Sequence, residues 1–330
     1  MLTKRQNFLQ TIHGGKPDRF VNSYEFLNLF YAIDPITGAA PPFPPIGGES
    51  KSLWGVTVRW VEGQPGPMPL HDDAHKVVKD ITTWRDVVHA PKTHYPASDW
   101  EDGIKKVEAI DRNEQYACLC FFTGVFEQLH YLQGITESLI NFYEYPKETH
   151  ELIDYITEYE LAYAEEVTKY LKPDALFHHD DWGSYTTLLL SPDMFREFIL
   201  PAYKKIYGYY KSHGVEIVVH HCDSYAAPLV PHMIEAGIDV FQGCTSTNNV
   251  PKLVKEYGGK ISFMGDLDSG ILDRPDWSRE RIRKEVERAC RSNGKHYFIP
   301  CLVQGLDLST FPGVYEAVTE EIDRMSKELF

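Results

Sequence analysis

The feature of this 330-residue sequence that most constrains its fold is a regular alternation of short apolar runs and amphipathic stretches after about residue 115. The runs do not alternate apolar with polar residues, which is typical of strands buried on both faces. Strand and helix patterns that repeat in this way predict βα units and a parallel sheet. The expected strands are Tyr116–Phe122, Ala175–His179, Val215–His220, Ile238–Gln242, Lys260–Met264 and Tyr297–Cys301.

The number of units predicts one (β/α)8 TIM barrel, a single domain over residues 1–330, with an N-terminal elaboration of helix and loops. A doubly wound sheet is the alternative, but no glycine-rich phosphate loop follows a first strand. A helix is expected over residues 3–14 and a first short strand at Arg19–Asn22. Proline and glycine crowd residues 38–48 and 62–69, which predicts irregular surface loops or a lid over an active site.

The overall charge narrows the range of partners. A net charge of −15 and a pI of about 5.4 disfavour binding to nucleic acids and anionic membranes.

No apolar run approaches the roughly 20 residues that span a bilayer, and the first residues lack the apolar core of a signal peptide. The six cysteines are scattered through the chain, so we expect a reducing cytoplasm and thiols that are free to bind metal.

Polar side chains gather where the predicted strands end. In a parallel barrel the carboxyl ends of the strands form the active-site face. We therefore expect these groups to surround one site: Asp180, Asp181, His220, Cys222, Gln242, Asp266, Asp268 and Cys301.

Three of these residues suggest a zinc centre. His220 and Cys222 are two apart, so on a strand they point to the same side. Cys301 follows 79 residues after Cys222, at the end of another strand. One imidazole and two thiolates suit zinc with an open fourth position, which could bind a thiol as thiolate or polarise an ether oxygen. The alternative is a buried strand histidine with two ordinary buried cysteines.

The sequence resembles the uroporphyrinogen decarboxylase superfamily and, within it, the branch of zinc- and corrinoid-dependent methyltransferases. The segments that carry the resemblance are 4–9, 16–19, 220–224, 236–240 and 264–268, together with Cys301. The zinc motif of that branch is His-x-Cys followed by a distant Cys, and His220, Cys222 and Cys301 match it position by position. The resemblance therefore implies a barrel, bound Zn2+ and a corrinoid (cobalamin) carried by a partner protein.

The resemblance implies methyl transfer from a small methylated substrate to Co(I) of the corrinoid protein. We favour an O-methyl aromatic ether as the donor, which would make the chain an O-demethylase component. The alternatives are a methylcorrinoid:thiol methyltransferase and a metal-free lyase like uroporphyrinogen decarboxylase. Decarboxylases of the family carry an arginine-rich N-terminal segment, whereas this chain has no arginine between Arg19 and Arg59, which argues against the lyase.

Other candidates have competing interpretations. Glu127 follows a strand end and is a fourth ligand, a substrate partner, or a carboxylate placed to favour the start of a helix. Asp181 orients substrate or His220, or is an ordinary loop acid. Asp266 and Asp268 line the barrel mouth near the corrinoid or cap the next helix, and we expect His178 and His179 to be structural.

Overall fold

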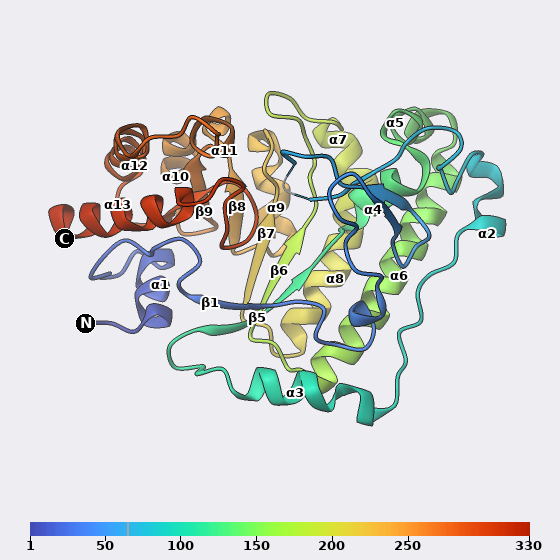
Figure 1. The fold of residues 1–330 in the computed structure, drawn as a ribbon, viewed down its shortest axis with the longest axis horizontal. Helices are drawn as coiled ribbons and strands as arrows, with labels where there is room; N and C mark the ends of the chain where they lie inside the picture. Colours follow the sequence, from blue (N-terminus) through green and yellow to red (C-terminus); the bar gives the residue numbers. More distant parts are fainter. Residues whose placement is uncertain (65) are drawn as a thin grey trace.

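The computed structural model describes residues 1–64 and 66–330. Its centre is a parallel sheet of seven strands in the order β1-β5-β6-β7-β8-β9-β10 (Figure 1). The strands are β1 (Leu27–Phe30), β5 (Tyr116–Phe121), β6 (Ala175–His179), β7 (Ile217–His221), β8 (Val240–Cys244), β9 (Ser262–Leu267) and β10 (Phe298–Leu302). The six strands expected after residue 115 are all present, and four of them end one to three residues later than the sequence pattern indicates.

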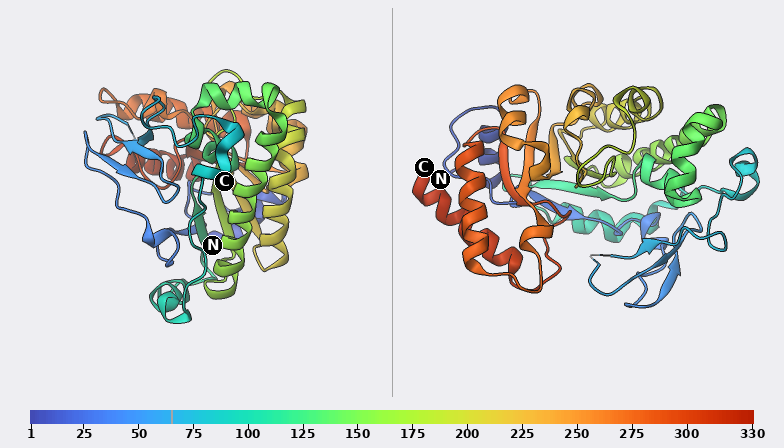
Figure 2. Two further views of the ribbon diagram at one scale, coloured as in Figure 1. Left: turned by 90° about the vertical axis from the view of Figure 1, so that its right-hand side faces the viewer. Right: turned by 90° about the horizontal axis from the view of Figure 1, so that it is seen from above.

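Helices connect the strands and cover the outer face of the sheet (Figures 1 and 2). They are α1 (Lys4–Ile12), α2 (Trp84–Val87), α3 (Glu101–Glu108), α4 (Val125–Gln133), α5 (Ile135–Glu144), α6 (Pro146–Tyr170), α7 (Pro192–Met194), a π-helical turn (Phe195–Ile199), α8 (Leu200–Ser212), α9 (Val230–Ala236), α10 (Val250–Tyr257), α11 (Ser269–Leu272), α12 (Arg279–Asn293) and α13 (Val314–Leu329). Their boundaries follow local chemistry. The side chain of Ser278 caps α12 by accepting the Arg281 N–H, and Gly237 ends α9 in the left-handed conformation.

Alternate residues of each strand face two separate apolar clusters. The outer cluster, which includes Leu119, Leu176 and Val218, packs against the helices. The interior cluster is enclosed by the sheet and consists of Phe8, Ile12, Val21, Tyr24, Phe26, Leu27, Tyr116, Cys118, Cys120, Ala175, Phe177, Ile217, Val219, Val240, Met264, Ile299 and Cys301. A curled parallel sheet around a filled interior confirms the predicted α/β barrel-like fold.

Helix α1 covers the amino ends of the strands. The ring of Phe8 stacks on Phe26 with centroids 3.9 Å apart and meets Tyr116, the first residue of β5, edge to face. Arg5 places its guanidinium 3.9 Å above the Tyr116 ring. With its amino end closed in this way, the barrel leaves the carboxyl ends of its strands as the open face.

The prediction of a first strand at Arg19–Asn22 is wrong, because the first strand of the sheet is β1. The residues before β1 instead join the two edges of the sheet. The Phe20 N–H donates to Ser326 Oγ of α13 at 3.1 Å, and Tyr24 Oη donates to the carbonyl of Gln304, beyond β10, at 3.4 Å. Side-chain and loop contacts therefore bring the β1 and β10 edges together.

The proline-rich region carries a small antiparallel sheet of β2 (Glu49–Lys51), β3 (Thr57–Arg59) and β4 (Met68–Pro69). The expected loop at 38–48 is irregular after a short 3₁₀ turn at Thr37–Ala39. The expected loop at 62–69 ends in β4, and its residue 65 lies outside the described residues. In the part of the chain that the structure describes, no helix is both long and apolar enough to cross a membrane.

Gly124, which precedes α4, provides a test of how tightly β6 and α8 approach this helix. A Cβ atom at Gly124 would lie 2.5 Å from Asp180 Cβ and 2.5 Å from Tyr203 Oη. We expect Gly124→Ala to lower the free energy of unfolding by roughly 1–3 kcal/mol, because overpacking forces both neighbours to move.

Gly208, inside α8, is the matched control. A Cβ atom there meets nothing within 4 Å. We expect Gly208→Ala to raise the free energy of unfolding by roughly 0.5–1 kcal/mol, since alanine is the better helix former. Denaturant unfolding of both variants gives the comparison, and equal effects would contradict the tight approach at Gly124.

Candidate active site at the carboxyl ends of the strands

His220 faces the helices and not the barrel interior. Its Nδ1 lies 2.7 Å from Tyr207 Oη, and its Nε2 lies 3.2 Å from the carbonyl oxygen of Asp180. Its ring stacks on Trp182 at 4.0 Å between centroids. A carbonyl only accepts, so Nε2 carries the hydrogen and Nδ1 accepts from the tyrosine. Both nitrogens of this predicted zinc ligand are therefore already used.

The two predicted thiolate ligands belong to different clusters. Cys222, just after β7, lies in the outer cluster, where its Sγ accepts the Trp182 N–H at 3.4 Å and lies 2.9 Å from Ser224 Oγ. Cys301, on β10, lies in the interior cluster. Burial raises the pKa of both thiols well above the ordinary value. The structure places His220 and Cys222 on one face, as their spacing predicts, and Cys301 on the other. Their assignment as zinc ligands stays a prediction.

The residues that do converge are His179, Asp181 and His221. One potential ligand atom from each lies within 4.8 Å of the others, which makes this the one group of its kind among residues 1–64 and 66–330. His179 and His221 are register partners at the ends of β6 and β7, and their rings stack at 4.3 Å. Both follow interior residues by strand alternation, so both face the inside of the barrel at its open end.

Each histidine of this group is held from behind. His179 Nδ1 lies 2.7 Å from Glu127 Oε2, in the first turn of α4. His221 Nδ1 is hydrogen-bonded to Gln242 Oε1 on β8. Asp181 accepts the N–H of Asp223 through Oδ1 at 2.8 Å. The predicted residues Glu127 and Asp181 thus lie beside His179, which the sequence pattern indicates as structural, and His221, for which it predicts no role.

Burial and charge shape the protonation of these groups. Burial opposes the charging of His179, but the adjacent Glu127 raises its pKa to about 10. Burial raises the pKa of Glu127 to about 7 and, together with Asp181, that of Asp223 to about 7. Burial also lowers the pKa of His221 to about 4, with the nearby His179 adding to the effect. The two imidazoles, although stacked, therefore differ in charge at neutral pH.

Asp180, between His179 and Asp181 in sequence, faces the opposite way and fixes the start of α4. Its carboxylate accepts the N–H groups of Phe126 at 3.0 Å and Glu127 at 2.7 Å. It also accepts Trp182 Nε1 at 2.9 Å and the hydroxyl of Tyr203. The position of Glu127, and through it the orientation of His179, depends on this fully buried carboxylate.

The structure uses Asp266 and Asp268 to hold neighbouring elements. The carboxylate of Asp266 accepts Arg288 Nη1 at 3.0 Å and Asn293 Nδ2 at 2.6 Å, both from α12. Positive φ angles of 150° at Gly265 and 62° at Asp266 break the strand alternation, which turns this side chain outward. Asp268 accepts the N–H of Ser246 at 2.8 Å and Tyr185 Oη at 2.7 Å. The side chain of Asp268 makes no capping bond to α11, and that of Asp266 bonds to α12. The assignment of Asp266 and Asp268 to the corrinoid stays a prediction.

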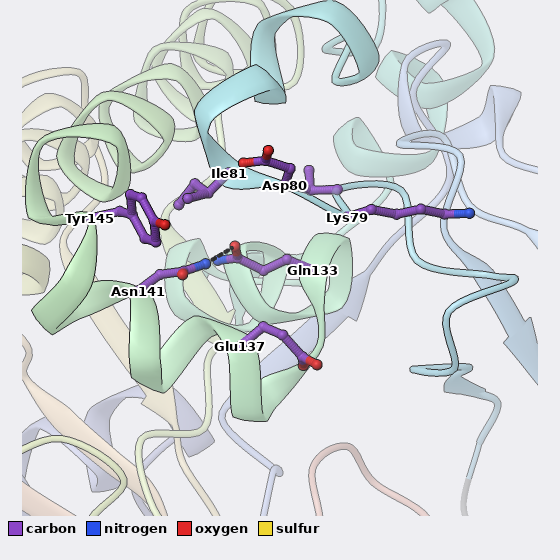
Figure 3. A pocket seen from close by; sticks show the side chains of 8 residues that line it. Lys79, Asp80, Ile81, Gln133, Glu137, Asn141 and Tyr145 are labelled. Carbon is purple, nitrogen blue, oxygen red and sulfur yellow. Dashed lines mark hydrogen bonds between the residues drawn. The ribbon is translucent and has the colours of Figure 1, made fainter.

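A separate surface cavity of about 300 Å³ lies between residues 78–81 and helices α4 and α5 (Figure 3). Asn141 Nδ2 donates to Gln133 Oε1 across it at 2.8 Å. Within the described chain, its lining includes none of the predicted site residues. The cavity is therefore not part of the group at the strand ends.

The chain belongs to the uroporphyrinogen decarboxylase (URO-D) family, whose pattern matches residues 53–325, and this confirms the family recognised from the sequence. A relative from Methanosarcina mazei, a methylated-thiol–coenzyme M methyltransferase, is 26% identical over 166 residues. That match spans 49% of this chain and only 38% of the relative.

The fold is also shared with a solved structure. A methyltransferase from Methanosarcina mazei superposes with a TM-score of 0.67 over 98% of this chain and 99% of the other, at 14% identity. At that identity the likeness supports the fold alone. Together with the family match it confirms the barrel-like α/β architecture.

The structure gives a direct test of Asp180 as the anchor of the site. We expect Asp180→Asn to lower the free energy of unfolding by roughly 2–4 kcal/mol, because an amide cannot accept from all the buried donors around it. The measurement is the urea midpoint at unchanged slope.

The control for this variant is Asp193→Asn, since Asp193 is an exposed residue of α7 that pairs with Arg196 across the surface. We expect a change within about 0.5 kcal/mol there. Comparable losses for the two variants would show that Asp180 does not anchor α4.

Proposed function

We propose that the protein is a methyltransferase that moves a methyl group between a small methylated substrate and the cobalt of a corrinoid protein. The observation that carries the proposal is the similarity to methylated-thiol–coenzyme M methyltransferase in a chain of the URO-D family. The match covers about half of this chain, so activity, substrate and partner are all proposed. The residues at the strand ends supply a site that suits this chemistry.

The favoured donor is an O-methyl aromatic ether, because aromatic rings border the site. Phe122 lies 5.4 Å from the His179 ring and 6.4 Å from that of Tyr31. Phe122 is 40% exposed and Tyr31 54% exposed. These rings can stack on an aromatic donor and hold its methoxy group towards His179.

The reaction sets a further requirement. Co(I) attacks the methyl carbon, a cobalt–carbon bond forms, and the carbon–oxygen bond breaks with its electron pair left on oxygen. A proton donor or a cation must lie beside that oxygen to stabilise the negative charge that develops on it. His179 and His221 are both held through Nδ1, so their Nε2 atoms are the places where a proton or a cation can be held for it.

The chemistry of the predicted zinc ligands does not fit a single metal position in this geometry. His220 has both nitrogens engaged, and Cys222 and Cys301 occupy separate clusters. We therefore assign no step of the reaction to zinc held by these three residues.

A second candidate is transfer from the methylcorrinoid to a thiol, which the name of the relative favours. A metal-free decarboxylase is less well supported. Three side chains near His179 at the barrel mouth, Glu127, Asp181 and Asp223, are acidic, which disfavours binding of the carboxylates of a porphyrinogen.

The proposal predicts a measurable methyl transfer. The purified protein is mixed with Co(I) cobalamin and, in separate reactions, a methoxyphenol or a methylated thiol, and the methyl-Co(III) spectrum is followed. We expect the methoxyphenol to be demethylated. Asp181→Asn should slow the reaction at least about 10-fold, since it removes a charge from the site.

Asp193→Asn serves as the control and should keep the rate. Reaction with the methylated thiol alone, or methylation of a thiol by methylcobalamin, would select the second candidate. Methyl transfer in none of these mixtures, by protein that is folded, would refute the proposal.

A further inference from the structure

The geometry points to a metal site that differs from the one predicted by the sequence motif. We propose that His179, Asp181 and His221 bind one divalent transition-metal ion, through Nε2 of each imidazole and the Asp181 carboxylate. One ring nitrogen of each histidine and a carboxylate oxygen of Asp181 lie within 4.8 Å of one another. Around zinc with bond lengths of about 2.0–2.1 Å, neighbouring ligand atoms lie about 3.4 Å apart. The distances between the ligand atoms of the three residues therefore need to shorten by roughly 1.5 Å at most for an ion to bind.

The tautomer of His221 is fixed by Gln242. The amide nitrogen of Gln242 donates to the carbonyls of Leu302 and Val303, each at 3.4 Å. Its oxygen is therefore the atom that faces His221 Nδ1, and an amide oxygen only accepts. Nδ1 must carry the hydrogen, which leaves the lone pair of the neutral ring on Nε2. This is the arrangement in which metal-binding histidines are usually held.

His179 and Asp181 are also held in place by hydrogen bonds, and His179 must release the proton on its Nε2 when an ion binds. Glu127 accepts from His179 Nδ1 at 2.7 Å, as in a carboxylate–histidine–metal arrangement. Glu127 is itself fixed by the bond from its N–H to Asp180. Asp181 accepts the N–H of Asp223 through Oδ1, so Oδ2 is the oxygen that would bind the ion. The ends of β6 and β7 thus bring the three residues together, and among the residues that the structure describes no hydrogen bond uses either Nε2 atom.

The donor set indicates the class of ion. Two imidazoles and one carboxylate suit zinc and also Fe(II), Co(II) and Mn(II), and they leave coordination positions open. With neutral imidazoles and one carboxylate, a divalent ion keeps a net charge of +1. With two thiolates, as in the motif-based site, it would keep none. The proposed site is therefore the stronger Lewis acid, and its use on the leaving oxygen rests on the proposed function.

The test measures metal binding without any methyl donor or corrinoid, so that its outcome is independent of the methyl-transfer assay. The full chain is stripped with a chelator and titrated with Zn(II) and with Co(II). We expect about one ion per chain. Asp181→Asn and His221→Gln should each weaken binding at least about 10-fold, whereas Cys222→Ser and Cys301→Ser should leave it within about 3-fold.

Spectroscopy of the Co(II) form separates the two ligand sets. We expect ligand-field bands without thiolate-to-cobalt charge transfer. The surface variant His75→Gln, whose imidazole pairs with Asp72, controls for binding at exposed histidines and should behave as the wild type. If His221→Gln unfolds, Asp181→Asn alone decides, because the Asp181 side chain is only partly buried. A charge-transfer band that disappears in Cys222→Ser, or no stoichiometric binding by the folded wild type, would overturn the proposal.

Discussion

The structure around the site depends on the hydrogen bonds that the buried carboxylate of Asp180 accepts. A buried charge is tolerated only when donors replace the water it has lost. Here the donors come from α4, from Trp182 and from Tyr203 on α8, so one carboxylate ties β6 to two helices. The N-terminus of α4 adds a favourable dipole. Because Glu127 is among the residues held in this way, the orientation of His179 follows from the same interaction.

Because successive residues of a strand point to opposite faces, adjacent histidines on β6 and β7 have different surroundings. The doublets His178-His179 and His220-His221 lie side by side on β6 and β7, in register. His178 and His220 point outward, where Glu160 accepts from His178 at 2.9 Å and Tyr207 bonds to His220. The other two point inward at the open end of the barrel. One face of the pair of strands therefore supports packing against the helices, while the other can hold a ligand.

Much of the fold could be predicted from the sequence, because each strand after residue 115 is a separate apolar run followed by a helical pattern. The first strand could not, since Arg19–Asn22 and Leu27–Phe30 are both short and the choice depends on pairing with β5. The family could also be recognised from the sequence. The parallel topology predicts a candidate site at the carboxyl ends of the strands.

The members of the site were harder to predict, because they depend on which face each residue occupies. Cys301 is at a strand end, as expected. Whether its side chain points to the helices or to the interior depends on the residue at which β10 begins, because successive residues of a strand point to opposite faces. At Asp266 the left-handed backbone reverses the face altogether. A signal for His179 was nevertheless present: it is two residues from the apolar Phe177, just as His221 is two from Val219. Both therefore share the interior face.

The charge of the open end gives the last constraint. Glu127 and Asp223 lie near the carboxyl group of Asp181, and burial together with this repulsion raises the pKa of both to about 7. The charge of Glu127 in turn raises the pKa of His179. A divalent ion on the Nε2 side would instead compensate the same charges directly, while Glu127 and Gln242 keep both rings in place.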